Sequence, residues 1–379
     1  MMIKWIFKYS AVIFIFNTVL FHIDSTIFLA DIIFFGLMGL YAVILLMNIK
    51  HMKIVLFHKS FSFLLIITFL NFLYFMIFHS FNDIDAINYL LARSVQFSIF
   101  SVSVFFSYEY YKERFLNHFI YFTAIIVFFG FIVNPYLFSG RYSGLLWNPN
   151  MLSSLVTLAF SVLLLKNQRF SRIEYFLLFL FLLVAIATGS RGSLVAIILA
   201  AFFKYGYSKR NFLYAFIALI SAILVINLPF QTSINRFAAE SMLYDRILQY
   251  KFAIASIAEK FYVGYGLDKY SYIDMNLVPA YLVGPVKGAH NGYLAILTQY
   301  GVIFGSIILY IIIKKSADLM LFYKKYSRSE IAYLFIVVYA LVAAIYESLI
   351  TGINELHTSL FWLALSFLSF SKFKQEYGH

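Results

Sequence analysis

Long apolar runs alternate with short polar segments along nearly the whole chain of 379 residues. Most runs approach the roughly 20 residues that a helix needs to cross the hydrocarbon core of a bilayer. The runs lie at residues 5–23, 26–47, 61–78, 89–108, 115–133, 151–165, 175–187, 194–203, 212–228, 293–313, 331–349 and 356–370. We therefore expect an all-α fold, a polytopic membrane helix bundle of about 12 transmembrane helices with a large helical loop outside the membrane between helices 9 and 10.

The composition supports a membrane chain and excludes several kinds of chemistry. Hydrophobic residues make up 63% of the chain and charged residues 12%, with a mean hydropathy of +0.86. A soluble domain carries about twice that share of charged residues, so lipid is the solvent that suits this chain. The first run has no small-residue cleavage site, which predicts an anchor that stays in place. There is no cysteine, which excludes disulfides, thiolate metal sites and a cysteine nucleophile.

The basic residues predict the orientation. With the N-terminus in the cytoplasm, the cytoplasmic segments hold 20 of the 29 Lys and Arg residues. They are Lys4, Lys8, Lys50, Lys53, Lys59, Lys112, Arg114, Lys166, Arg169, Arg172, Lys204, Lys209, Arg210, Lys314, Lys315, Lys324, Lys325, Arg328, Lys372 and Lys374. The opposite orientation would place all of them outside, against the positive-inside rule. The net charge of +12 therefore indicates topology and no nucleic-acid partner, and both termini are expected in the cytoplasm.

The hydrophilic segment 229–290 is expected to cap a single membrane domain that spans residues 1–379. All five prolines lie in or beside outside segments, at Pro135, Pro149, Pro229, Pro279 and Pro285. Apolar residues recur in the segment at mostly three- and four-residue intervals, which predicts an amphipathic helix on the membrane or across the bundle. They are Ile234, Phe237, Leu243, Ile247, Tyr250, Ile254 and Ile257.

Nine Lys and Arg residues remain in outside segments, where the positive-inside rule disfavours them, so their presence has to be explained. Six lie in the long loop beside five acids, where a solvated charged face is the simpler interpretation for any single lysine. These six are Arg236, Arg246, Lys251, Lys260, Lys269 and Lys287. The other three, Arg93, Arg141 and Arg191, lie in or beside short connections.

Arg191 is the most informative of these cations. Only 31 residues separate Arg172 from Lys204, and two membrane crossings of about 20 residues each do not fit comfortably. Either the flanking cations snorkel inward, or the turn around Arg191 lies below the outer surface. The turn is then at the floor of an outward-facing depression, where a charged side chain normally has a partner. That partner is either Glu347 or Asp31 in a structural ion pair, or an anionic ligand, which we favour.

Phosphate is the anion that arginine suits best. A guanidinium group donates two parallel hydrogen bonds and stays charged. Several arginines beside a membrane depression therefore suggest a lipid-linked phosphate or pyrophosphate. Aromatic residues, 21% of the chain, also suit stacking on sugars, although most are expected to face lipid.

His290 differs from the other histidines because it closes the long loop and opens the tenth run. An imidazole titrates near neutral pH, so it can accept a proton from a sugar hydroxyl or donate a hydrogen bond to it. The alternative is a plain helix-capping pair of His290 and Asn291.

Four short motifs follow one another on the outside segments. They are RYSGLLWNPN at 141–150, TGSRG at 188–192, Asp245-Arg246 leading to Gly264-Tyr265-Gly266, and HNGYL at 290–294 with Gly301. In their order and in the twelve-helix layout, the chain resembles the bacterial superfamily of O-antigen ligases and O-antigen polymerases. The resemblance covers residues 130–305.

The resemblance implies a metal-independent, inverting glycosyltransferase without a cofactor, whose donor is an oligosaccharide on undecaprenyl pyrophosphate. Arg191 and Arg246 would hold the pyrophosphate, and His290 would orient or deprotonate the acceptor hydroxyl. These three are the expected catalytic residues. The expected substrate contacts are Arg141, Asn150, Asp245, Tyr250 and Asn291, with Asp245 either a second base or a counter-charge for Arg246. Preorganised arginines would stabilise the charge of the departing pyrophosphate most in the transition state.

The function expected first is that of an O-antigen, or related surface polysaccharide, polymerase in the bacterial inner membrane, with its active face in the periplasm. The alternative is an O-antigen ligase, which passes the finished chain to lipid A core. Membrane lipid and a chain-length regulator protein are expected partners. A lipid-linked oligosaccharide flippase or another transporter is a weaker alternative, because such folds usually divide into related halves. A purely structural scaffold would leave the outside arginines unexplained.

Overall fold

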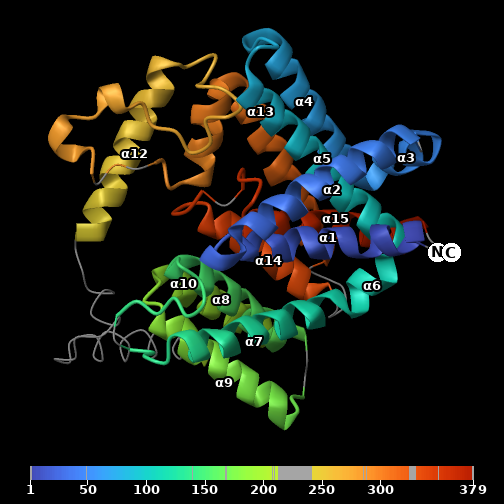
Figure 1. Cartoon of the computed structure of the whole chain (residues 1–379), viewed down its shortest axis with the longest axis vertical. Helices are drawn as coiled ribbons and strands as arrows, with labels where there is room; N and C mark the ends of the chain where they lie inside the picture. Colours follow the sequence, from blue (N-terminus) through green and yellow to red (C-terminus); the bar gives the residue numbers. More distant parts are fainter. Residues whose placement is uncertain are drawn as a thin grey trace.

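The computed structural model describes residues 2–47, 49–138, 140–166, 169–206, 208, 210–211, 241–284, 286, 288–323, 330–348 and 350–377. Over these residues the fold is all-helical and contains no strand, which confirms the predicted class (Figure 1). The helices are α1 (Met2–Leu20), α2 (Ile27–Met47), α3 (Ile49–Leu56), α4 (Ser62–Phe78), α5 (Ile84–Phe106), α6 (Tyr108–Glu113), α7 (Phe115–Val133), α8 (Pro149–Lys166), α9 (Arg172–Ala187), α10 (Arg191–Tyr205), α12 (Ser241–Glu259), α13 (Gly292–Tyr323), α14 (Ile331–Ala343) and α15 (Leu356–Tyr377). Short 3-10 turns are η1 (Asp24–Thr26), η2 (Lys59–Phe61), η4 (Met275–Leu277) and η5 (Ala280–Leu282).

Six of the described helical segments are long and apolar enough to cross a membrane. They are Asp24–Met47, Lys59–Phe78, Ile84–Phe106, Phe115–Val133, Pro149–Lys166 and Gly292–Tyr323. On α2, Phe28 is 78% exposed and Phe35 is 67% exposed. In water such side chains would favour aggregation, whereas lipid accepts them. The chain is therefore a multi-pass membrane protein.

Eleven of the twelve predicted runs coincide with described helices, and the ninth, residues 212–228, lies outside the described residues. Some of these helices are short: α9 has 16 residues and α10 has 15. At 1.5 Å per residue they extend about 24 and 22 Å, less than the hydrocarbon thickness of about 30 Å. Twelve crossings therefore stay a prediction. The helix predicted over residues 331–349 is too long at its C-terminal end. In the structure α14 ends at Ala343, and Glu347 is no longer helical.

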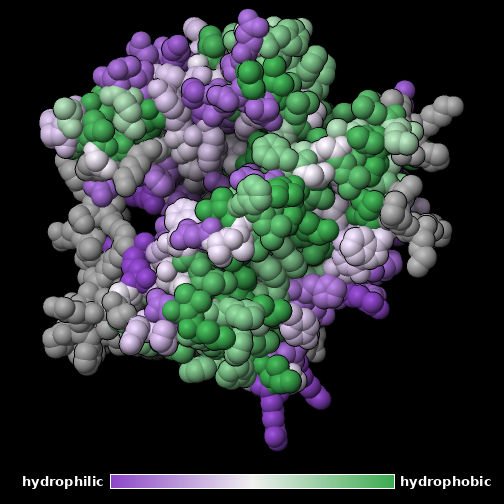
Figure 2. All heavy atoms as spheres, in the orientation of Figure 1, coloured by the Kyte–Doolittle hydropathy of each residue, from purple (hydrophilic) through white to green (hydrophobic). Residues whose placement is uncertain are grey.

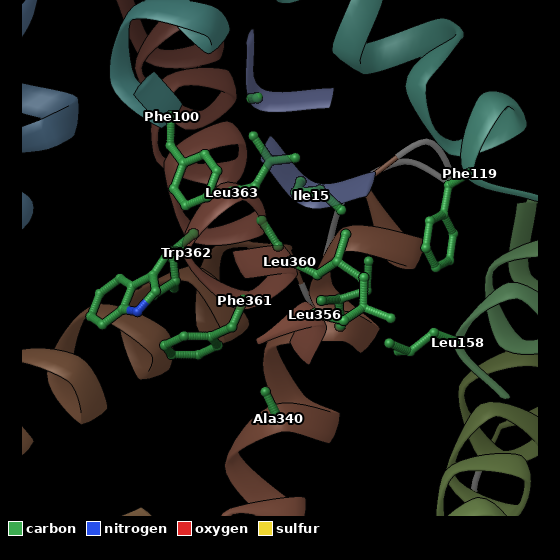
Figure 3. Packing of buried hydrophobic residues seen from close by; sticks show 14 of the residues in the cluster. Ile15, Phe100, Phe119, Leu158, Ala340, Leu356, Leu360, Phe361, Trp362 and Leu363 are labelled. Carbon is green, nitrogen blue, oxygen red and sulfur yellow. The ribbon is translucent and has the colours of Figure 1, made fainter. Parts of the chain in front are cut away.

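The last helix, α15, forms the centre of the bundle. Its apolar side chains lie near Ile15 of α1, Phe100 of α5, Phe119 of α7 and Leu158 of α8 (Figure 3). Every residue from 356 to 371 is buried. Protein rather than lipid surrounds this helix, which explains why it includes several serines and is less apolar than the outer helices.

The described residues between 241 and 290 form a cap on one side of the bundle, in which α12 is followed by a long turn-rich segment (Figure 1). The cap has its own small core, where Leu248 and Phe252 of α12 pack with Ile273. The predicted helix is present as α12, and two residues of its predicted apolar stripe do not pack on the bundle, since Ile247 is 64% exposed and Ile254 is 57% exposed. Apolar residues occur on two adjacent faces of α12, and only tertiary contacts choose between them. Two further residues of the predicted apolar stripe, Ile234 and Phe237, lie outside the described residues.

The cap joins α13 where this helix breaks at Gly301, whose φ is +69°. The backbone N–H of Tyr265 donates to the Thr298 carbonyl at 2.9 Å, which uses an acceptor beside the break. A Cβ on Gly264 would lie 2.3 Å from the backbone nitrogen of Gly301. Glycine is therefore required on both sides of this contact.

The start of α1 and the end of α15 lie at the same end of the molecule, away from the cap (Figure 1). At this end the ammonium of Lys374 lies 3.9 Å from the Glu109 carboxylate and 4.3 Å from the ring centroid of Tyr108. The ammonium of Lys8 lies 4.9 Å from the ring centroid of Tyr110. Segments that the charge pattern assigns to the cytoplasm therefore gather together.

Candidate anion-binding site

A cavity of about 420 Å³ lies between the cap and the bundle and is lined by three arginine side chains. Arg141 comes from the connection between α7 and α8, Arg191 is the first residue of α10, and Arg246 lies on α12 of the cap. Figure 2 shows hydrophilic surface on this side of the molecule, between α12 and α10. Three predicted phosphate ligands thus meet in one place, which we call the arginine cavity.

Three helices begin at the arginine cavity. Its lining includes Asn150 in the first turn of α8, Arg191 at the start of α10, and Leu356 at the start of α15. The helix dipole favours negative charge at such an end. The first N–H groups of α8 already have an acceptor, since that of Asn150 donates to Oδ1 of Asn148 at 2.9 Å, so at α8 the dipole alone favours an anion. Pro149 at the first position of α8 suits this end of a helix, since it has no N–H to satisfy. The backbone and the side chains therefore both favour an anion.

Arg141 links two of the sequence motifs. Its Nε donates to the carbonyl of Thr188 at 3.2 Å, and its Nη2 donates to Oδ1 of Asn150. The backbone N–H of Tyr142 also donates to the carbonyl of Ala187, at 3.1 Å. The segment 141–150 and the turn that precedes Arg191 are therefore one structure, and Asn150 orients a neighbouring guanidinium.

Arg246 is bound to Glu347, in the connection between α14 and α15. Its Nη2 donates to Oε1 of Glu347 at 2.9 Å, and its Nη1 donates to Oε1 of Gln249 at 3.2 Å. The other oxygen of Glu347, Oε2, lies 3.4 Å from Nδ1 of His290. Burial raises the pKa of Glu347, but the His290 hydrogen bond and the Arg246 charge outweigh this and hold that pKa below its usual value. Glu347, considered as a partner for Arg191, is thus the partner of Arg246 and His290.

His290 itself is absent from the described residues that line the cavity. Its φ is +40°, a left-handed conformation that is uncommon for a residue with a side chain. In this position it contacts Glu347, which does line the cavity. His290 therefore reaches the arginine cavity through a carboxylate.

Tyr250 and Asn291 hold the same connection between α14 and α15. The Tyr250 hydroxyl and Nδ2 of Asn291 both donate to the carbonyl of Ile345, at 2.6 and 2.8 Å. Oδ1 of Asn291 accepts from the backbone N–H of Leu294 at 2.9 Å, so Asn291 caps α13. Neither residue, nor Asp245, belongs to the described lining of the cavity. Their roles as substrate contacts stay predictions.

Arg93, another of the predicted outside arginines, also holds this connection. It is 3% exposed, and its guanidinium donates to the carbonyls of Thr351 and Gly352 and to Oε1 of Gln96. Nε2 of Gln96 in turn donates to the carbonyl of Ile353 at 3.0 Å. Arg93 is therefore a structural residue of α5 that fastens the backbone beside the cavity.

The arginine cavity is positively charged. Two carboxyls line it with the three arginines: Glu347 and Glu355. Burial raises the pKa of Glu355 to about 7, so this group is only partly ionised at neutral pH. Even with both acids ionised, three positive charges less two negative ones leave +1. A cavity of this charge attracts an anionic group such as a diphosphate.

Glu347 and Glu355 are the site residues that sequence reasoning missed. Glu347 was considered only as a partner for Arg191, and Glu355 was not considered. A signal was present, because these are the two acids between residues 331 and 370, in a stretch that is otherwise apolar. An acid within such a stretch is normally retained for a partner or a function.

Comparison with known proteins identifies one family. Residues 176–310 match the family model described as O-antigen ligase, and this segment contains Arg191 and Arg246. No curated protein matches the chain. Members of the family are glycosyltransferase-like membrane enzymes, both polymerases and ligases, and the family implies lipid-linked glycan substrates. The match covers this segment of the 379 residues, and it supports the resemblance to the superfamily of O-antigen polymerases and ligases that the sequence motifs indicated.

Proposed function

We propose that this protein is an O-antigen, or related surface polysaccharide, polymerase. It transfers a growing glycan from undecaprenyl pyrophosphate to the non-reducing end of a lipid-linked repeat unit, on the periplasmic side of the inner membrane. The observation that carries the proposal is the convergence of Arg141, Arg191 and Arg246 with three helix N-termini on one cavity.

The proposed reaction is a displacement with inversion at the anomeric carbon of the donor. The acceptor hydroxyl oxygen attacks that carbon while the bond to the pyrophosphate breaks and leaves its electron pair on a phosphate oxygen. Arg191 and Arg246 hold the pyrophosphate, and Arg141 supports the same group from the α7–α8 connection. Positive groups that are already in place stabilise this charge most strongly in a site shielded from water.

A reconstituted reaction tests the proposal. The purified full-length protein is placed in lipid nanodiscs with the lipid-linked repeat unit isolated from the same bacterium. Longer lipid-linked glycans and free undecaprenyl pyrophosphate are the expected products. Movement of the substrate across a vesicle membrane without a new glycosidic bond would instead indicate a transporter.

The second candidate is an O-antigen ligase, and the description of the matching family model favours it. A ligase uses the same donor but transfers the glycan to lipid A core. The lipopolysaccharide of a deletion strain separates the two. Core that carries a single repeat unit indicates a polymerase, whereas bare core indicates a ligase.

A further inference from the structure

Glu355 lies immediately before α15 and lines the arginine cavity. Its Oε1 accepts a hydrogen bond from the Tyr270 hydroxyl at 2.9 Å, and its Oε2 accepts one from Oγ1 of Thr358 at 3.2 Å. Both partners are uncharged hydroxyl groups. The carboxyl is therefore held in one orientation by two groups that carry no positive charge.

The surroundings of Glu355 make it a stronger base than an ordinary carboxylate. Burial raises its pKa to about 7, and the hydrogen bonds from Tyr270 and Thr358 offset only part of this rise. The charge of Glu347 raises the same pKa and the charge of Arg93 lowers it. Among the described residues, the other charged or titratable side chains that line the cavity are Arg141, Arg191, Arg246, His22, Tyr339, Tyr346 and His357. A base whose pKa lies near the working pH is the most effective proton acceptor.

His290 is less well placed for proton transfer. Its Nδ1 faces Glu347 at 3.4 Å, and it lies outside the described lining of the cavity. Glu347 is also unsuited, because its hydrogen bonds to Arg246 and His290 stabilise the ionised form and make it a weak base. Glu355 is the carboxyl that combines access to the cavity with basicity.

We propose that Glu355 is the catalytic base for the acceptor hydroxyl, and that His290 is a positioning residue that acts through Glu347. This inference rests on the proposed transfer reaction. The Glu355 carboxylate takes the proton of the acceptor O–H as the acceptor oxygen bonds to the anomeric carbon. The bond from that carbon to the phosphate oxygen breaks, and its electron pair stays on the pyrophosphate. The proton then leaves Glu355 for water, which restores the carboxylate.

The test measures transfer rates of the full-length protein in nanodiscs between about pH 5.5 and 9, with the lipid-linked repeat unit as substrate. The wild-type rate should rise about tenfold per pH unit and level off near pH 7. Glu355→Gln should lower the rate at least about 100-fold and remove this rise, since a general base contributes about 10²- to 10⁴-fold. Binding of undecaprenyl pyrophosphate should stay within about twofold of wild type, because the arginines are intact. His290→Gln should lower the rate but keep the rise.

A second variant tests the same group without removing it. Tyr270→Phe deletes a hydrogen bond that favours the ionised form of Glu355, so the rise in rate should move to higher pH. An unmoved pH profile in Tyr270→Phe, or a Glu355→Gln rate above about a tenth of wild type, would overturn the inference while leaving the transfer reaction established. A wild-type protein that makes no glycosidic bond would overturn the proposed function itself.

Discussion

Nη2 of Arg246 and Oε1 of Glu347 lie 2.9 Å apart and join the cap to the connection between α14 and α15. His290 meets the other oxygen of the same carboxylate at 3.4 Å. One carboxylate therefore positions two of the predicted catalytic side chains. A guanidinium has five N–H donors, so Arg246 can keep this bond and still donate to a phosphate oxygen.

Replacing Arg191 should slow transfer strongly while the protein still inserts. Arg191→Ala is expected to lower the rate at least about 100-fold, because the departing pyrophosphate loses a charge that stabilises it. Arg191→Lys should lose at least about tenfold, since lysine cannot donate two parallel hydrogen bonds. Lys251, exposed on α12 and outside the described lining of the cavity, provides the control: Lys251→Ala should keep the wild-type rate. Full activity in both Arg191 variants would contradict the pyrophosphate role.

The Arg246–Glu347 pair should behave as a unit in kinetics. Arg246→Ala and Glu347→Gln are each expected to lower kcat/KM, and the double variant should lose less than the two single losses combined. For a partly exposed pair we expect a coupling free energy of about 1 kcal/mol. If the loss of kcat/KM in the double variant equals the product of the two single losses, the two side chains act independently.

The stability of the protein should fall as pH rises through neutrality. The pKa of Glu355 is raised from 4.5 to about 7, so the folded state keeps a proton that the unfolded state releases in this range. The corresponding stability is complete below about pH 4.5 and is lost as pH rises through about 7, amounting to about 3 kcal/mol. Glu355→Gln has no carboxyl to ionise, so this variant does not lose stability in that pH range. Its Tm relative to wild type should therefore be higher at pH 8 than at pH 5, and an equal difference at both values would contradict the shift.

Glu347 should have the opposite pH dependence. Its pKa is held below the usual value, so the stability it contributes is present above about pH 4.5 and is lost as pH falls through its folded-state pKa. Glu347→Gln should therefore reduce Tm at pH 7 but approach wild type in acid. A variant that stays equally destabilised below pH 4 would indicate lost packing instead of a lost charge.

Arg93→Ala should destabilise the bundle, because Arg93 fastens the connection between α14 and α15. The backbone carbonyls of Thr351 and Gly352 would lose a buried donor, at a cost of about 2–4 kcal/mol. Leu91, 58% exposed on the same helix, offers the matched control, since Leu91→Ala removes little buried surface. Thermal unfolding in detergent measures both, and equal Tm values would show that the carbonyls find other donors.

Gly264→Ala should prevent the cap from docking on α13. The added Cβ would overlap the Gly301 backbone at 2.3 Å, and the φ of +72° strains any residue with a side chain. Gly284, also in the cap, has open space around its Cβ position, so Gly284→Ala should be tolerated. Comparable yields and proteolysis patterns for the two variants would show that the backbone at Gly264 and Gly301 can move apart enough to accept the added Cβ.

Much of this organisation could be predicted from sequence because hydropathy and charge are local properties. The positions of the described helices follow the apolar runs, and placing Arg141, Arg191 and Arg246 on one side of the membrane already made their convergence plausible. The packing face of α12 could not be predicted, since Leu248 and Ile247 are equally apolar and only the rest of the cap decides which is buried.

The role of the connection between α14 and α15 could not be predicted from neighbouring residues in the sequence either. Hydropathy extends the eleventh run to residue 349, but the helix ends at Ala343 because the following backbone is held from several directions. Tyr250, Asn291 and Arg93 supply those bonds from three distant segments. No window of sequence contains such contacts, and Tyr270, which donates to Glu355, is equally distant in the chain.

The glycine contact between the cap and α13 has a mechanical consequence. Hydrogen bonds between backbones leave little freedom to rotate, so the cap must follow any tilt of the helix on which it sits. Arg246 travels with the cap, whereas Arg141 and Arg191 belong to the group of α7, α8 and α10. The spacing of the three guanidinium groups is therefore set by α13 together with the α14–α15 connection, to which Arg246 and Tyr250 of the cap are also bonded.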